Sequence, residues 1–239
     1  HTNGLIAAQH YKSFGPVIFS CWSDNNVPNF DTDCLLIRND YPKGYYHNFM
    51  NVFYQATTTL EGLKQVKTPF AIKFRCDEIY SDISKLVEKV TNNPNKMITN
   101  NIAFSHVYDV KYHPSDHVIG STTEAMLYTF EHVIDVCRKN PSYIEHLPGS
   151  VVGFKDMGCT PEVIICSQYL KYKGVEFDQL DGSLDECRRI MREHYDMVGV
   201  EELGDVTWSM WGEGRRWFRK GNDSLYGYVY DSIKSMDEL

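Results

Sequence analysis

The sequence predicts an α/β fold, because short apolar segments alternate with amphipathic helical patterns. Three apolar runs, at 17–22, 34–37 and 70–75, have the length of buried strands and end in polar residues. Between the second and third runs, apolar side chains recur at three- and four-residue spacing over 47–67, which predicts an amphipathic helix. Because strands that alternate with helices tend to pair in parallel, we expect a largely parallel central sheet flanked by helices.

The same alternation continues toward the C-terminus. The pattern predicts helices over 81–90, 123–138, 160–173 and 184–195, strands over 97–99 and 102–104, and a loop over 108–115. The start of one helix is well marked: Thr160 is a good N-cap, Pro161 suits the first turn, and Glu162 is favoured by the helix dipole. We predict one domain over 1–239, with a core over 1–183 and a helical, aromatic extension over 184–239.

Composition excludes several classes of protein. The 239 residues carry 32 Asp+Glu against 24 Lys+Arg, a formal net charge of -8. This balance argues against a general nucleic-acid binder, which needs a basic face, and against attachment to an anionic membrane. No apolar run is long enough to span a bilayer. Seven cysteines without a C-x-x-C pair predict free thiols in a reducing compartment, so we expect a cytoplasmic protein, with a position peripheral to a membrane as the alternative.

Charged side chains gather at the end of the third predicted strand. Lys73 and Arg75 lie on one side of this strand by two-residue alternation, and Asp77 is in phase with them if the strand continues. A hard divalent cation prefers carboxylate oxygens and often shares them with substrate phosphates. The segment would therefore suit a metal–diphosphate site, but taken alone it favours the alternative, a salt-bridged strand end.

The motifs, taken in order, resemble the WavE lipopolysaccharide synthesis family, whose members look like GT-A glycosyltransferases. The resemblance is carried by Asn48, Asn51, Gln55 and Thr57–Thr59 in the first helix, Gly62-Leu63, Lys73-x-Arg75-x-Asp77, Ser115-Asp116 with Gly120, Pro161-Glu162, Glu201-x-Leu203-Gly204 with Trp208, and Phe19–Trp22. It implies a GT-A-like (Rossmann-like) sheet and an enzyme that transfers a sugar from a nucleotide-sugar donor to a glycan acceptor.

The resemblance also implies roles for individual residues. Asp77, with Glu78, would bind a divalent cation (Mn²⁺ or Mg²⁺). Arg75 stands where GT-A enzymes usually have the first Asp of Asp-x-Asp, so it can pair with a phosphate directly, and this departure leaves metal dependence open. Gln55 and Thr58 share one helix face, with Thr59, and would line the donor pocket; the alternative is that the threonines cover a solvent-facing side of the helix.

Two carboxylates are candidates for the base that activates the acceptor hydroxyl. Asp116 lies in a polar loop, where its alternative role is to form a turn. Glu162 resembles the Glu that opens a helix in many inverting GT-A enzymes, where its alternative role is helix stabilisation. The sequence leaves both open. In the tail, Arg215 and Arg216 belong to a basic, tryptophan-containing run that would bind an anion, or form a solvated amphipathic segment.

Other interpretations remain at this point. His113 and His117 are four residues apart, but Pro114 between them argues against a zinc-binding helix and favours a surface loop. A nucleotidyltransferase also uses strand-end carboxylates, although the Gly-rich basic loop that it needs is not visible. A non-catalytic glycan-binding module is the third reading. An inverting reaction is expected by analogy.

Overall fold

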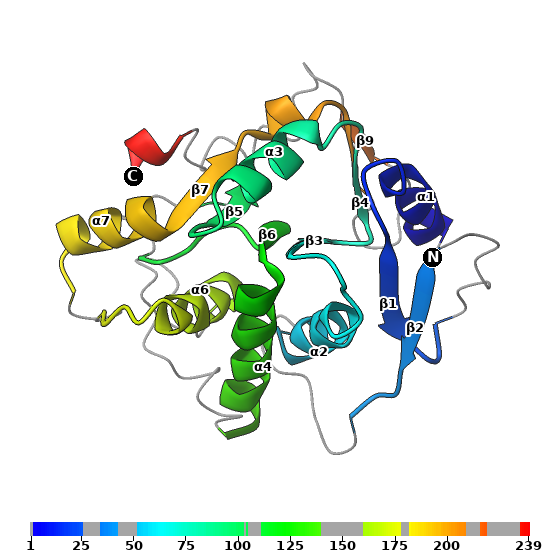
Figure 1. Cartoon of the computed structure of the whole chain (residues 1–239), viewed down its shortest axis with the longest axis horizontal. Coiled ribbons are helices and arrows are strands. Elements are labelled where there is room, and N and C mark those ends of the chain that lie inside the picture. The colour runs from blue at the N-terminus through cyan, green and yellow to red at the C-terminus, as the bar shows by residue number, and fades with distance from the viewer. Residues whose placement is uncertain are drawn as a thin grey trace.

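The structure is a computed structural model that describes residues 2–25, 34–42, 52–102, 104, 111–139, 160–177, 182–208, 216–218 and 235–239. Within these ranges helices and strands alternate, and helices flank the largest sheet (Figure 1). The predicted α/β class is therefore confirmed.

The elements of the first half begin with a helix. They are α1 (Thr2–Tyr11), β1 (Ile18–Trp22), β2 (Leu35–Asn39), α2 (Val52–Leu63), β3 (Phe70–Phe74), β4 (Glu78–Tyr80), α3 (Ser84–Asn92) and β5 (Met97–Asn100). The second half contains β6 (Val118–Thr122), α4 (Thr123–Lys139), α6 (Pro161–Tyr172), α7 (Leu184–His194), β7 (Tyr195–Val198), η2 (Val200–Leu203), β8 (Val206–Trp208), β9 (Arg216–Phe218) and η3 (Met236–Glu238).

The strands form three sheets among the described residues, and the expectation of one largely parallel sheet is wrong. The four-stranded sheet has the order β3-β6-β5-β7, and β6 runs antiparallel to both of its neighbours. Only β5 and β7 pair in parallel within it. The sequence predicted a loop, with no helix, between β5 and β6. Without a crossover helix a chain returns antiparallel to the strand it has just left.

The other two sheets are smaller. β1 and β2 form a parallel pair, and β4, β8 and β9 form an antiparallel sheet in the order β4-β8-β9. The GT-A-like arrangement of the strands stays a prediction.

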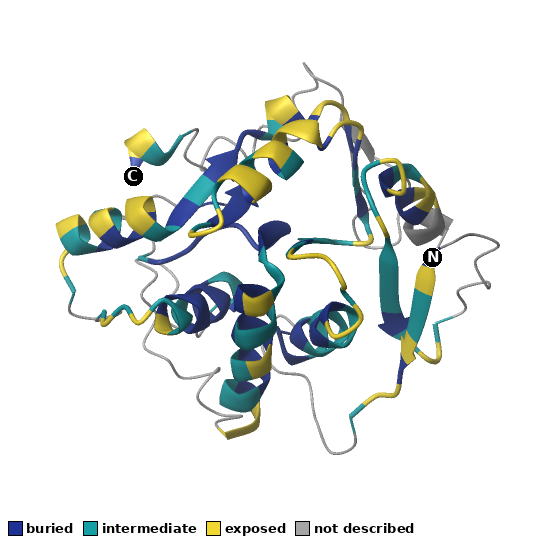
Figure 2. Cartoon of the chain, in the orientation of Figure 1, coloured by how far each residue is buried: buried dark blue, intermediate teal, exposed yellow. Residues whose placement is uncertain are grey.

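Alternation along the central strands separates two hydrophobic cores. Met97 and Ile119 face the cluster that contains α2, α4 and α6, whereas Ile98 and Val118 face the cluster that contains α1 and α3. Helices α4 and α6 thus lie on one side of the sheet and α3 on the other (Figure 1). The central strands are mostly buried, and the outer faces of the helices are exposed (Figure 2).

Gly120 allows β6 to pack closely against α3. A Cβ atom built on this residue would lie 2.5 Å from Val90 Cγ2 and 3.3 Å from Ile72 Cγ1. Such distances leave no room for a side chain. The family motif that ends in this glycine therefore has a packing reason on the α3 side of the sheet.

Several element boundaries differ from the predictions. The helix predicted over 47–67 is seen as α2, which ends at Leu63 in a turn before Thr68-Pro69. The strand predicted over 102–104 is not formed by the described residues there. Instead Asn101 begins a turn, in which Phe104 N donates to Asn101 O at 3.3 Å. The sequence missed α1 and β4, since neither has a distinctive apolar pattern.

The C-terminal part packs on the same core. Cys187, Ile190 and Met191 of α7 belong to the cluster of α2, α4 and α6. Arg188 Nε donates to the backbone oxygen of Leu239 at 2.8 Å, which holds the end of the chain against α7. The boundary predicted between 183 and 184 stays a prediction.

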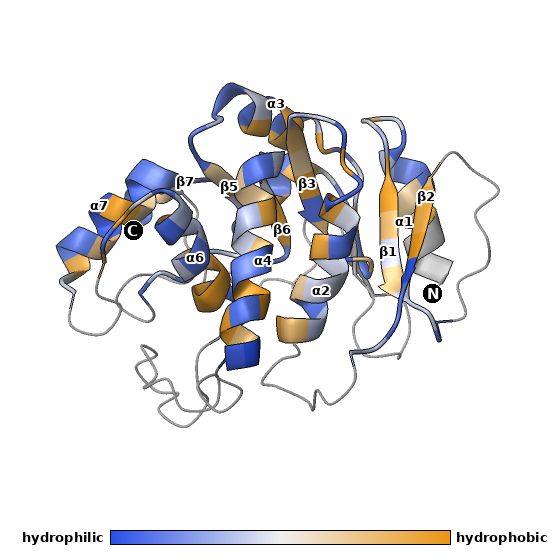
Figure 3. Ribbon diagram, turned by 60° about the horizontal axis from the view of Figure 1, so that its bottom comes forward, coloured by the Kyte–Doolittle hydropathy of each residue, from blue (hydrophilic) through white to orange (hydrophobic). Residues whose placement is uncertain are grey.

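In the part of the chain that the structure describes, no helix has the length and apolar character needed to cross a membrane. Polar and apolar residues alternate along the helices instead (Figure 3).

Candidate functional site

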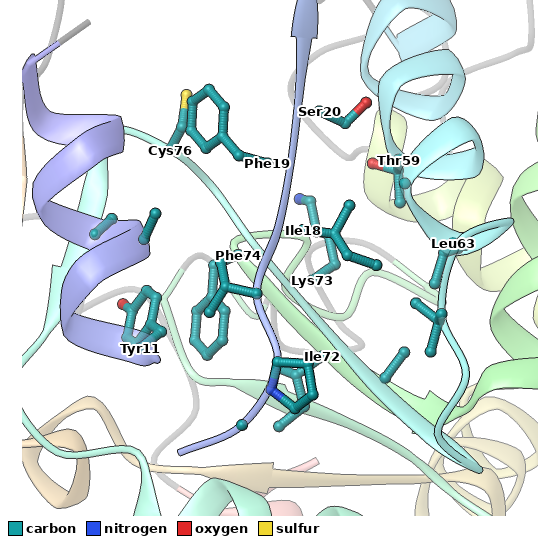
Figure 4. A pocket seen from close by; sticks show the side chains of 18 of the residues that line it. Tyr11, Ile18, Phe19, Ser20, Thr59, Leu63, Ile72, Lys73, Phe74 and Cys76 are labelled. Atoms are coloured by element: carbon teal, nitrogen blue, oxygen red, sulfur yellow. The ribbon is translucent and has the colours of Figure 1, made fainter. Parts of the chain in front are cut away.

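A cavity of about 950 Å³ lies between the β1–β2 pair and the outer strand β3 of the four-stranded sheet. Its lining comes mainly from α1, β1, α2, β3 and α3. Figure 4 shows the apolar side chains of Ile72 and Phe74, with Tyr11, around one part of it, and Ser20, Thr59 and Lys73, with Ile18, around another. The cavity therefore has an apolar region and a polar, cationic region.

Helix α2 contributes the predicted polar face to this cavity. Gln55, Thr58 and Thr59 all line it, as their spacing on one helix face predicts. The Thr58 hydroxyl donates to the backbone oxygens of Tyr54 and Gln55 at 3.2 and 3.1 Å. Gln55 Nε2 donates to Asp116 Oδ2 at 2.7 Å, so this side chain joins the cavity to the predicted base.

Lys73 joins the same two regions from β3. Its ammonium group donates to the backbone oxygen of Asp116 at 2.5 Å, and the residue also lines the cavity. Burial lowers the pKa of Lys73, and the charge of Asp116 opposes this shift. The buried Lys73 ammonium is therefore stabilised mainly by an anionic partner.

Arg75 contacts two carboxylates at once. Its Nε and a terminal nitrogen donate to the two oxygens of Asp77 at 3.1 and 3.0 Å, and Nε also lies 3.1 Å from Glu78 Oε1. Burial alone lowers the pKa of Arg75, but the bond to Asp77 and the charge of Glu78 raise it above its ordinary value. Arg75 and Asp77 line the cavity, whereas Glu78 is fully buried beneath them.

A closed circuit of hydrogen bonds holds Glu78 in place. Its Oε1 pairs with His117 Nδ1, and its Oε2 accepts from the Tyr80 hydroxyl at 2.6 Å. Asn100 donates to that hydroxyl at 2.9 Å and accepts from the Ser115 hydroxyl at 2.7 Å. Ser115 in turn accepts from the backbone NH of His117 at 3.3 Å. The segment that carries Asp116 is thereby fixed on both sides.

These contacts decide how well Asp77 and Glu78 fit a divalent ion. Both oxygens of Glu78 accept hydrogen bonds in the interior, and both oxygens of Asp77 accept from Arg75. The described ranges contain no group of three or more His, Cys, Asp or Glu side chains that could hold a metal. A cation also needs more oxygen ligands than this arrangement offers. As paired here, Asp77 and Glu78 offer few oxygens to an ion, and the metal requirement stays a prediction.

The two candidate bases lie close together but differ in environment. Burial raises the pKa of Asp116, but the charges of Lys73 and His117 and the bond from Gln55 together hold it below its ordinary value. Burial also raises the pKa of Glu162, and there the neighbouring charge of Asp116 raises it further. Glu162 Oε2 is buried without a hydrogen-bond partner and lies 3.6 Å from His113 Nε2.

Local sequence explains why Glu162 stands in the first turn of α6. It is the second residue of α6, whose N-cap Thr160 accepts from the backbone NH of Val163 at 3.4 Å. The first-turn position predicted for Glu162 is confirmed. Neither carboxylate lines the cavity, and both lie beyond Lys73 on the β6 and α6 side.

The structure corrects the interpretation of the two histidines. The sequence predicted a surface loop for His113 and His117, but both are buried and each pairs with a glutamate. Pro114 does prevent a helix there, as predicted. What no local signal could show is that Glu78 and Glu162, distant in the sequence, supply their partners.

An aromatic cluster at the ends of β1 and β2 was also missed. Trp22 stacks on Tyr41 with ring centroids 4.5 Å apart, and Tyr54 of α2 meets the edges of both rings. Trp22 and Tyr54 line the cavity. The sequence instead placed its aromatic surface in the tail.

The predicted basic tail is only partly described. Arg215 lies outside the described residues, and for Arg216 only the backbone is described. Strand register places Glu78 opposite Trp208, and Trp208 opposite Arg216. The backbone of Arg216 is therefore two strands, roughly 10 Å, from that of Glu78. Its role at an anion stays a prediction.

The fold and site thus define an α/β protein with cations beside a cavity and buried carboxylates behind them. Residues 11–188 match the family described as WavE lipopolysaccharide synthesis, so the chain belongs to that family, as the order of motifs predicted. The match includes every site residue discussed above except those of the tail. No curated protein matches the chain. Membership connects the chain with lipopolysaccharide synthesis and suggests a glycosyltransferase.

Proposed function

We propose that this protein transfers a sugar from a nucleotide-sugar donor to a glycan acceptor in lipopolysaccharide synthesis. One observation carries the proposal: Lys73, a cation on the cavity, donates to the backbone of Asp116, which lies beside Glu162. Cations for a leaving diphosphate and a carboxylate for an acceptor hydroxyl are thus neighbours. Inverting sugar transfer uses both groups at one centre.

In the proposed reaction the donor diphosphate lies against Arg75 and Lys73. As the bond between the sugar and the diphosphate breaks, negative charge grows on the leaving phosphate oxygens. Fixed cations in a partly desolvated cavity stabilise this charge more than water does. Arg75 stays charged throughout, because its carboxylate neighbours raise its pKa.

The position of the carboxylates orients the donor. Asp116 and Glu162 lie on the β6 side of Lys73, whereas the aromatic cluster of Trp22, Tyr41 and Tyr54 lies on the β1 side. The sugar must face the carboxylates, so the nucleoside faces the aromatic rings, which offer flat surfaces for stacking. Gln55 and Thr58 lie between these two ends.

Glu162 is the proposed base. A base must be ionised yet able to hold a proton, so a raised pKa suits it better than a lowered one. Glu162 has this raised pKa and a buried oxygen that accepts no hydrogen bond, whereas Asp116 accepts a hydrogen bond from Gln55 and has a lowered pKa. In this proposal the negative charge of Asp116 keeps the pKa of Glu162 raised, so that Glu162 can accept a proton. Attack from the face opposite the diphosphate would invert the anomeric centre.

The first test is thermal unfolding with a panel of nucleotides and nucleotide sugars, with and without manganese, followed by NMR of any product. We expect at least one nucleoside diphosphate to raise the melting temperature, and the product to have inverted configuration. No shift with any nucleotide would remove the transferase reading in favour of a glycan-binding module. Release of inorganic pyrophosphate from a nucleoside triphosphate would indicate a nucleotidyltransferase instead.

The predicted cytoplasmic location belongs to the same proposal, since nucleotide sugars would have to reach the cavity.

A further inference from the structure

Arg75 already holds an anion, and this anion belongs to the protein itself. The two nitrogen–oxygen contacts with Asp77 are 3.1 and 3.0 Å, the paired arrangement in which a guanidinium also binds a phosphate. A phosphate that binds at this same Nε–Nη2 edge of Arg75 must take the place of the Asp77 carboxylate.

The two acidic partners of Arg75 differ in how firmly they are held. Glu78 has no exposed side-chain surface, and its oxygens are engaged by His117 and Tyr80. Asp77 has a side chain that is 30% exposed, lines the cavity and lies in the turn between β3 and β4. Glu78 can therefore keep Arg75 in position while Asp77 moves away.

From these observations we infer that Asp77 is an exchangeable internal ligand of Arg75, which the diphosphate of the incoming substrate displaces. The inference rests on the proposed function only for the identity of that diphosphate. The exchange is electrostatic: the two hydrogen bonds from Arg75 to Asp77 break, two to a phosphate oxygen pair replace them, and no covalent bond changes. In the absence of substrate, Asp77 satisfies the partly buried cation and lowers its affinity for other anions.

This role makes a prediction opposite in sign to that of a metal ligand. If Asp77 competes with phosphate, removing its charge strengthens anion binding without any metal. If Asp77 instead binds a divalent ion that bridges to the phosphate, removing its charge weakens anion binding.

The probe is inorganic pyrophosphate, titrated by calorimetry into the full chain in EDTA. We expect Asp77→Asn to lower the dissociation constant about tenfold, because a like charge near the anion is lost. Asp77→Ala should change it in the same direction, which guards against an effect of the amide itself. Arg75→Gln should abolish saturable binding. The matched control is Asp185→Asn, which neutralises an Asp–Arg pair on α7, with 2.9 Å between Arg188 and Asp185, and should change nothing.

Several results would overturn the inference. One is an unchanged or higher dissociation constant in both Asp77 variants, and another is no pyrophosphate binding to either the wild type or Asp77→Asn. A third is binding that requires manganese in the wild type and is lost in Asp77→Asn. The titration contains no sugar, so a protein that shows the tenfold change but transfers no sugar would contradict only the proposed function. Sugar transfer without that change would contradict only the exchange.

Discussion

The two ends of the candidate site differ in how their charges are neutralised. At the cavity end, Arg75 has more acidic partners than it needs, one fixed and one exposed. At the other end, Glu162 has an oxygen without any hydrogen-bond partner and a raised pKa. A cation with an exchangeable partner is suited to recognise an anion, whereas a carboxylate with an oxygen that accepts no hydrogen bond is suited to take a proton. Lys73 and Gln55 connect these two environments through Asp116.

The largest effect is expected from Glu162→Gln, which removes the proposed base and keeps the shape of the side chain. We expect kcat for sugar transfer to fall about 10³-fold, in the range typical of a lost general base. Nucleotide affinity should stay within a factor of two, since Glu162 lies outside the cavity lining.

The control for that experiment is Glu124→Gln. Glu124 is the second residue of α4, as Glu162 is of α6, so both variants lose the same charge from a first helical turn. The control should change stability by about 0.3–1 kcal/mol and leave kcat unaltered. Equal kcat values for the two variants would show that Glu162 only stabilises its helix.

The next effect concerns the packing that supports the site. Gly120→Ala should lower the free energy of unfolding by about 1–3 kcal/mol, because the added methyl group overlaps Val90. Urea unfolding followed by circular dichroism measures this change.

Gly62→Ala is the matched control for that substitution. A Cβ on Gly62 would meet Ser20 Cβ at 3.5 Å, an ordinary contact, and alanine favours the helix. Its stability should be unchanged or higher by up to about 1 kcal/mol. If both variants lost the same stability, the close approach of β6 and α3 would not explain Gly120.

The smallest expected effect separates the roles of the two carboxylates. The charge of Asp116 raises the pKa of Glu162, so Asp116→Asn should lower that pKa. Because a base must be ionised to work, the acidic limb of the kcat profile should move to lower pH. The loss of kcat at neutral pH should be about tenfold, well below that of Glu162→Gln. An acidic limb that disappeared, with a loss as large as in Glu162→Gln, would assign the base to Asp116.

Local patterns predicted the helices and strands that have a strong apolar period. α4, α6 and α7 lie close to their predicted bounds, and β1, β3 and β5 do as well. β4 was missed because three residues are too few to show a pattern, and its pairing partner β8 lies more than a hundred residues away. The direction of β6 relative to β5 depends on how the chain between these strands connects them. Local propensity does not describe that connection.

For the site, the sequence by itself determined which residue types stand at the strand ends and helix starts: Lys73 and Arg75 on β3 and after it, Gln55 on α2, and Glu162 in the first turn of α6. These follow from short-range periodicity and capping, which depend on near neighbours. Only the tertiary structure decided their partners. It buried Glu78 with His117, joined Lys73 and Gln55 to Asp116, and left Glu162 with a raised pKa beside Asp116. The pairing of a charge, and hence its chemistry, depends on residues brought together across the fold, and on the burial that makes each pairing matter.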